Sequence, residues 1–126
     1  MNTIKILAYL AAFSFASVNS IAYAENNEQV KAAIEQTVTK LEEAVAALDK
    51  GADPKAIVDM VIEAKQAQKS ISTSDPKVSI KKSQGSNKLG KARTSLNDGD
   101  LKAGGDLVRE ALADYKEVKE KYNATH

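Results

Sequence analysis

The sequence predicts an all-α fold: an up-down-up-down antiparallel four-helix bundle built from a duplicated helical hairpin. Two observations predict it. Apolar residues recur in steps of three and four along each long segment of the chain behind its N-terminal region, which is the period of an amphipathic helix. The segment that begins at Lys40 also recurs in a second segment that begins at Lys88. Such repetition indicates two copies of a unit that buries its apolar face only against the other copy.

The repeat keeps a constant offset up to a glycine and then drops one residue. Ala52, which follows Gly51, has no counterpart after Gly99, and the match resumes with Asp53 opposite Asp100. Glycines and aspartates fall in register as well as apolar residues, which favours duplication over a chance alignment of two helices rich in Ala, Lys and Glu. The matched pairs are Lys40/Lys88, Leu41/Leu89, Ala44/Ala92, Leu48/Leu96, Gly51/Gly99, Asp53/Asp100, Lys55/Lys102, Ala56/Ala103, Asp59/Asp106, Val61/Val108, Glu63/Glu110, Ala64/Ala111 and Lys69/Lys116.

Residues 1–24 are predicted to be a cleaved export signal, and residues 25–126 to form one domain. Lys5 is the only charged residue before Glu25; an apolar stretch follows it and ends in Ala22-Tyr23-Ala24, the small-x-small pattern that a signal peptidase reads. The apolar stretch is too short to cross roughly 30 Å of hydrocarbon comfortably, and no stop-transfer charge cluster follows it. We therefore expect a periplasmic protein that is not an integral membrane protein after cleavage.

Composition narrows the classes of function. The chain has no Cys, which excludes disulfides and a lipoprotein anchor. Removal of Lys5 with the signal takes the formal net charge from +1 to zero, and a neutral chain argues against a nucleic-acid partner. Tyr115 and Tyr122 are the only aromatic residues behind the signal. We therefore expect a core of Leu, Ile, Val and Ala, with no aromatic-lined ligand pocket.

The first predicted helix runs from about Asn27 to Lys50 and ends at Gly51, a residue suited to the left-handed position after a helix. Asp53-Pro54 begins the second, with Asp as N-cap and Pro in the first turn, where its missing N–H costs nothing. Ser72-Thr73-Ser74 is predicted to be a loop. The apolar stripes are Ile34, Val38, Leu41, Val45 and Leu48 in the first helix, and Ile57, Val61, Ala64, Gln68 and Ile71 in the second.

Asp75-Pro76 begins the third predicted helix, which is the weakest. Gly85 and Gly90 interrupt its stripe, and each internal glycine costs about 1 kcal/mol relative to Ala. Either a continuous soft helix or a break near Gly85 is expected; if both glycines are helical, replacing either by Ala should stabilise the fold. Asn97-Asp98-Gly99-Asp100 predicts a tight turn, and the fourth helix runs from about Leu101 to Tyr122. The stripes are Val78, Leu89, Ala92 and Leu96, then Leu107, Val108, Ala111, Leu112, Tyr115 and Val118.

No catalytic constellation and no cofactor motif is evident, so a non-enzymatic protein is expected. The one His is the terminal His126, and a Ser is not activated without an oriented base. The turn at Gly99 does not fit a calcium loop, because Leu96 and Gly105 would fall at ligand positions. Gly104-Gly105 replace the bulkier Ile57-Val58 of the first copy, which indicates either a close helix crossing or a shallow groove.

Two pairs of carboxylates lie one helical turn apart, Asp59/Glu63 and Asp106/Glu110. They either supply oxygen ligands to a divalent metal or form solvated salt-bridged faces, because the chain also places cations nearby. The candidate neutralising residues are Lys55, Lys102 and Arg109.

The third predicted helix is basic, with no acidic residue between Asp75 and Asp98. It either docks on an anionic envelope surface or an acidic protein partner, or it pairs internally with the acids of the first and fourth helices. Its cations are Lys77, Lys81, Lys82, Lys88, Lys91 and Arg93.

The second copy contains Lys88-Leu89-Gly90-Lys91-Ala92, Gly99-Asp100 and Val108-Arg109-Glu110-Ala111-Leu112. In these residues it resembles the small metal-binding proteins of the bacterial periplasm, and the similarity covers nearly the whole mature chain. It implies a signal peptide, a duplicated helical hairpin, and histidines along the helices that bind copper or nickel. Those positions hold Lys88, Ser95, Asp100 and Asp114 here.

Without imidazole or thiolate ligands, tight binding of copper or nickel loses its chemical basis. Two functions therefore stay open. One is a non-enzymatic periplasmic bundle of the small metal-binding type, with at most weak carboxylate-based binding of a divalent metal. The other is an adaptor or chaperone-like module that holds a protein or envelope surface through the basic third helix and the region of Gly104-Gly105.

Overall fold

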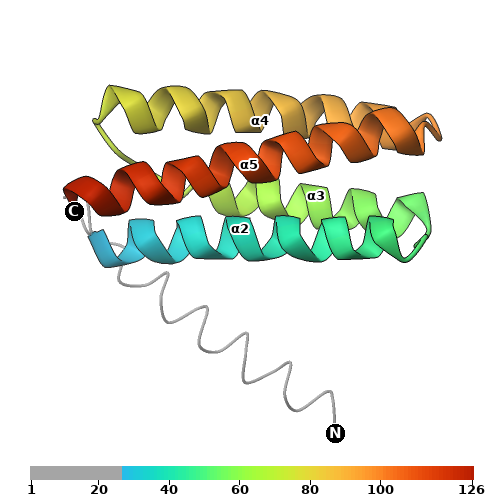
Figure 1. Ribbon diagram of the computed structural model, residues 1–126, viewed down its shortest axis with the longest axis horizontal. Helices are drawn as coiled ribbons and strands as arrows, with labels where there is room; N and C mark the ends of the chain where they lie inside the picture. The colour runs from blue at the N-terminus through green and yellow to red at the C-terminus, as the bar shows by residue number, and fades with distance from the viewer. Residues whose placement is uncertain (1–26) are drawn as a thin grey trace, which may run out of the picture.

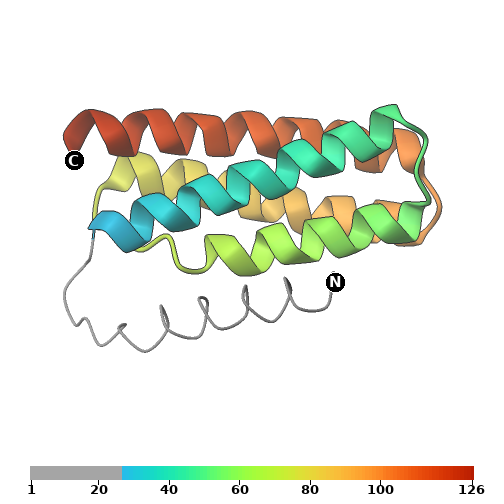
Figure 2. The same cartoon turned by 90° about the horizontal axis from the view of Figure 1, so that it is seen from below.

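The computed structural model describes residues 27–126; the predicted signal and its cleavage after Ala24 lie outside the described residues. Four helices form the described part: α2 (Asn27–Asp49), α3 (Pro54–Gln68), α4 (Pro76–Asn97) and α5 (Leu101–Thr125). Each helix runs back along the one before it, as Figures 1 and 2 show. Contacts join α2 to α3, α3 to α4, α4 to α5 and α5 to α2, which closes the ring. The predicted all-α bundle is confirmed for this part of the chain.

The turns form as their sequence predicts. Gly51 and Gly99 have φ angles of 74° and 86°, the left-handed conformation that ends a helix at little cost for glycine. Asp53, Asp75 and Asp100 cap the three helices that follow, each accepting a hydrogen bond of 3.0 Å from a backbone N–H two or three residues on. No helix in residues 27–126 is long and apolar enough to cross a membrane.

The core contains the predicted stripes, of which Tyr115 is a member, and in addition Tyr122. Tyr115 and Tyr122 are fully buried and are the largest side chains in the core, so the expected purely aliphatic core is wrong. Both tyrosines are buried because each hydroxyl has a partner. The Tyr122 hydroxyl donates to Asn27 Oδ1 at 2.7 Å, and that of Tyr115 lies 3.1 Å from both Gln68 Oε1 and the Lys82 carbonyl oxygen.

Helix α4 is continuous, so the alternative of a break near Gly85 is wrong. Gly85 is buried beneath the ring of Tyr115, and a Cβ atom placed there would lie 2.5 Å from Tyr115 Cε2. The glycine therefore makes room for an aromatic ring within a regular helix. Gly90 differs, because a Cβ atom there would meet only Lys65 Nζ, at 3.7 Å.

Gly104 and Gly105 form a close helix crossing rather than a groove. Both are buried at the start of α5. A Cβ atom at Gly104 would lie 2.6 Å from Leu96 Cγ, and one at Gly105 would lie 3.4 Å from a methyl carbon of Leu48. Leucine side chains from α4 and α2 thus occupy the space that the first copy gives to Ile57 and Val58.

The two glycines of α4 should respond oppositely to alanine. Gly90→Ala is expected to raise the free energy of unfolding by up to about 1 kcal/mol, because it removes an internal helical glycine without a clash. Gly85→Ala is expected to lower it by about 1–3 kcal/mol, because the new methyl group overlaps the Tyr115 ring. Urea unfolding of both variants measures the difference, and stabilisation of both would contradict this packing.

Stability should fall in alkali through Tyr115. Burial, and secondarily the charge of Asp114, raises the pKa of this phenol far above its ordinary value near 10. The unfolded chain therefore loses the proton above about pH 10 while the folded chain keeps it, and stability decreases as pH rises past that point. Tyr115→Phe should cost about 1 kcal/mol at neutral pH, and this cost should shrink above about pH 10. A cost that stays constant in urea titrations across that range would contradict the assignment.

Candidate functional site

Two lysines of α4 are neutralised by α5. Asp114, whose side chain is only 7% exposed, accepts a hydrogen bond of 2.8 Å from Lys88 Nζ and lies 3.6 Å from Lys81 Nζ. Lys81 also pairs with Glu117 at 3.2 Å, and Lys88 with Glu110 at 3.9 Å. The hydrogen bond to Glu117 is the main cause that raises the pKa of Lys81. Internal pairing thus accounts for these two cations, and their partner is α5 rather than the first helix.

Ion pairs also cross the seams between α2 and its two neighbours in the ring. Between α2 and α3, Lys40 Nζ lies 3.1 Å from Glu63 Oε1, and this hydrogen bond is the main cause that raises the pKa of Lys40. Three pairs join α5 to α2: Arg109–Asp49 at 2.8 Å, Lys119–Glu35 at 2.6 Å and Lys116–Glu42 at 3.8 Å.

The seam between α3 and α4 is different, because within residues 27–126 no ion pair crosses it. We call its cations, Lys65 of α3 with Lys82 and Arg93 of α4, the basic seam. Lys65 reaches across to Gly90, and Arg93 follows Gly90 by about one turn on the same side. Lys82 is partly buried, and this burial lowers its pKa. The basic seam is therefore a set of cations that no carboxylate of the described chain neutralises.

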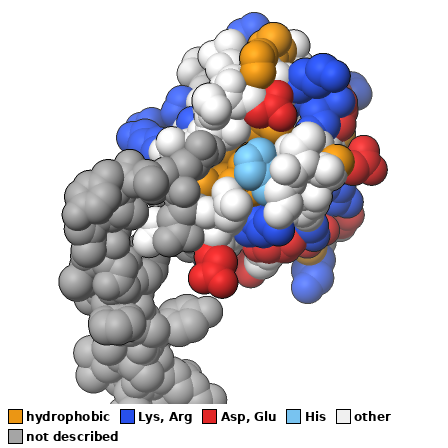
Figure 3. All heavy atoms as spheres, turned by 90° about the vertical axis from the view of Figure 1, so that its left-hand side faces the viewer, with side chains coloured by type: hydrophobic (Ala, Val, Ile, Leu, Met, Phe, Trp, Pro, Cys, Tyr) orange, Lys and Arg blue, Asp and Glu red, His pale blue; other side chains and the backbone are white. Residues whose placement is uncertain are grey.

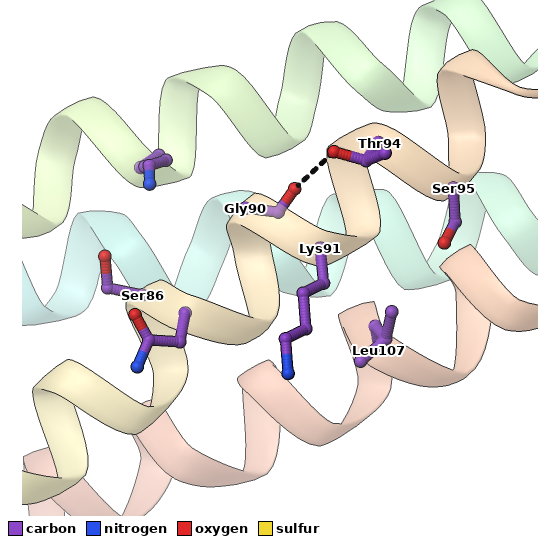
Figure 4. Close-up of a pocket in the computed structure, with 8 residues that line it drawn as sticks. Ser86, Gly90, Lys91, Thr94, Ser95 and Leu107 are labelled. Atoms are coloured by element: carbon purple, nitrogen blue, oxygen red, sulfur yellow. Dashed lines mark hydrogen bonds between the residues drawn. The ribbon is translucent and has the colours of Figure 1, made fainter.

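An open groove of about 620 Å³ lies beside the basic seam, on the outer surface of α4 around Gly90. Figure 4 shows Gly90 and Thr94 on the side of α4 nearer α3, and Lys91 reaching toward α5. The Thr94 hydroxyl donates to the Gly90 carbonyl at 3.2 Å. The other polar residues that line the groove are Lys65, Ser86, Asn87, Lys91 and Ser95.

Sequence reasoning identified Lys82, Lys91 and Arg93 but not Lys65. Lys65 lies on a helix of mixed charge, so composition alone did not single it out. The helical period places Lys65 at the edge of the face that buries Val61, Ala64 and Gln68. This position could have indicated that Lys65 lies beside a neighbouring helix.

Three of the four paired carboxylates, Glu63, Asp106 and Glu110, lie within 4 Å of a lysine. Glu63 is bound by Lys40, not by the expected Lys55, and Arg109 pairs with Asp49 of α2. Lys102 lies 3.7 Å from Asp106 as expected. Within residues 27–126, no group of three or more His, Cys, Asp or Glu side chains is arranged to hold a metal ion.

At the four positions where the resemblance implies histidines, this chain has other residues, and their side chains make other contacts. Lys88 and Asp114 form an ion pair, and the Asp100 N–H donates to the Ser95 carbonyl at 2.9 Å. The Asp100 carboxylate is used as the cap of α5, where it accepts from the Ala103 N–H. These residues do not fit a copper or nickel centre, because nitrogen donors suited to those metals are replaced by an ammonium group and isolated oxygens.

His126 lies at the end of the bundle where the described chain both begins and ends, and Figure 3 shows its ring at the surface. The imidazole stacks on Tyr122 with ring centroids 3.9 Å apart. Its Nδ1 lies 3.1 Å from the Tyr122 carbonyl oxygen and 2.9 Å from Thr125 Oγ1. The imidazole is thus held against the helix that it ends.

Among known proteins, no family model matches the chain, and no curated protein or solved structure matches it significantly.

Proposed function

We propose that the mature chain is a non-enzymatic periplasmic bundle that binds an anionic partner through the basic seam. The observation that carries this proposal is the uneven use of charge around the ring. Within residues 27–126, ion pairs cross three seams, whereas Lys65, Lys82 and Arg93 have no carboxylate partner at the fourth. Since the mature chain is neutral in sum, cations gathered on one face create a local positive potential that attracts anions.

Burial of Lys82 supports the same proposal. Partial desolvation disfavours the charged form of an amine, which is why its pKa is lowered. A carboxylate or phosphate brought beside it from a partner would relieve this cost. The acids of α3 do not do so: Glu63 is held by Lys40 on the side of α2, and Asp59 precedes it by one turn on the same face.

The proposal has a charge-matched test. The triple variant Lys65→Gln/Lys82→Gln/Arg93→Gln should elute from a dextran sulfate column at lower salt than the unaltered mature protein. The control Lys50→Gln/Lys102→Gln/Lys116→Gln removes the same charge elsewhere and should lose less retention. Binding should weaken toward physiological ionic strength, where exposed charges are screened over roughly 8 Å. Equal elution of the two triple variants would remove the basis of the proposal.

Weak binding of a divalent metal is a second candidate function, supported by the resemblance to small metal-binding proteins. The exposed carboxylates are not preorganised and lie beside cations, so they favour hard ions such as calcium, magnesium or manganese only weakly. We propose that the function of this chain does not depend on tight capture of copper or nickel.

Metal titration of the mature chain should give dissociation constants no tighter than about 10⁻⁴ M for any divalent ion at the helix faces. Residual copper binding is expected at the new amino terminus or at His126, since these are the nitrogen donors offered to copper. Deleting His126 and blocking the amine should abolish it. Micromolar binding that survives both changes would mean that carboxylates such as Asp106 and Glu110 form a metal site.

A further inference from the structure

The groove around Gly90 combines two cations with small polar side chains. Lys65 borders it from α3 and Lys91 lies on the far side of Gly90 toward α5. Neither lysine has an ion-pair partner within the described chain. Ser86, Asn87 and Ser95 add hydroxyl and amide groups, whereas the Thr94 proton is already donated to the Gly90 carbonyl. The two ammonium groups, the two serine hydroxyls and the Asn87 amide can therefore each donate a hydrogen bond to an anion.

We propose that this groove, together with the basic seam, binds a carboxylate-rich polypeptide segment in extended conformation. The inference rests on the proposed function and names the partner chemistry of the same face. Ammonium groups beside hydroxyl and amide donors suit carboxylates, which accept several charge-assisted hydrogen bonds each.

The absence of a side chain at Gly90 admits the backbone of such a segment. A Cβ atom at this position would meet nothing nearer than Lys65 Nζ, at 3.7 Å, so neither packing nor a turn requires glycine there. Glycine at such a place weakens the helix by about 1 kcal/mol. Close approach of another backbone to α4 is a use for glycine that offsets this cost.

The spacing of the cations fits an extended chain. From Lys82 to Arg93, α4 advances about 16 Å at about 1.5 Å per residue. An extended chain advances about 6.6 Å for every two residues, and side chains two apart lie on one face. Three carboxylates at alternate positions therefore span about 13 Å and reach the cations of both helices from one side. A single small anion is a poorer fit, because the groove is open and offers only several weak contacts that act best together.

A membrane surface is also a poorer fit than a polypeptide. A helix that lies in a lipid interface inserts an apolar face, and the apolar face of α4, with Val78, Leu89 and Ala92, is fully buried in the bundle. Among the described residues, the large hydrophobic side chains that are exposed are Ile80 and Leu101, and neither lines the groove. Only electrostatic adsorption would remain for lipid.

The test uses a fluorescent peptide of about ten residues, alternating Glu and Ser, which spans about 33 Å when extended. The control is an uncharged peptide of the same length, alternating Gln and Ser. Fluorescence anisotropy with the mature protein at low salt should show binding of the Glu peptide only. Lys65→Gln/Lys91→Gln should weaken this binding about tenfold, whereas Lys50→Gln/Lys102→Gln should leave it nearly unchanged.

Gly90→Gln separates binding from folding. It fills the groove without changing charge, and it should melt at or above the temperature of the unaltered protein because it replaces a helical glycine. We expect it to bind the Glu peptide about tenfold more weakly. Unchanged affinity in this variant would overturn the groove as the site, and equal binding of the uncharged peptide would overturn the carboxylate chemistry.

Vesicles of phosphatidylethanolamine and phosphatidylglycerol distinguish the partner classes. Binding of the Glu peptide with little binding to vesicles supports the inference. Vesicle binding that depends on Lys65, Lys82 and Arg93, with no peptide binding, would overturn the polypeptide and leave the basic seam as a lipid-binding face. If the variants lose neither peptide binding nor vesicle binding, and the two triple variants elute equally from dextran sulfate, the proposed function is overturned as well.

Discussion

The interaction on which the bundle depends most is the burial of Tyr115 against Gly85. The ring comes from α5, lies on the backbone of α4, and carries its hydroxyl to within 3.1 Å of Gln68 on α3 and of the Lys82 carbonyl. One side chain of α5 therefore contacts two further helices, α4 and α3. It ties α3 to α4 at the seam that no ion pair crosses within residues 27–126, and so the cations of that seam are not needed to hold the bundle together. A buried aromatic contact contributes stability here without consuming surface charge.

The other seams use charge for a different purpose. Exposed ion pairs contribute little stability individually, but they favour one arrangement of neighbouring helices over another. The lysines that face α5 meet Glu110, Asp114 and Glu117, and the acids of α2 meet Lys116, Lys119 and Arg109. This partition leaves the α3–α4 seam without an ion pair within residues 27–126. Lys81 and Lys88 of α4 are thus paired with α5, whereas Lys82 and Arg93 of the same helix have no ion-pair partner within residues 27–126.

The features that the sequence predicted are local ones. A glycine followed by Asp and Pro specifies its own turn, and an apolar stripe specifies its own buried face, so the helices and caps were accessible. The role of Gly85 was not, because it depends on Tyr115, thirty positions further along the chain. Internal pairing of Lys81 and Lys88 was predicted with acids of the first and fourth helices, and that only the fourth, α5, supplies their partners depends on the order of helices in the ring. The membership of Lys65 in the basic seam depends on the same order.

The repeat explains where the two hairpins came to differ. Lys40–Glu63 in the first corresponds to Lys88–Glu110 in the second, and both pairs form, at 3.1 and 3.9 Å. At the repeat offset, Asp114 corresponds to Ala67, and this new acid holds Lys88 at 2.8 Å, nearer than Glu110 does. Tyr115 corresponds to Gln68, and Gly85 to the buried Thr37. A larger residue on the returning helix thus accompanies a smaller one opposite, as close packing of a core requires. The second hairpin therefore has a buried aromatic ring and a buried carboxylate, paired with Lys88, where the first has Gln68 and Ala67.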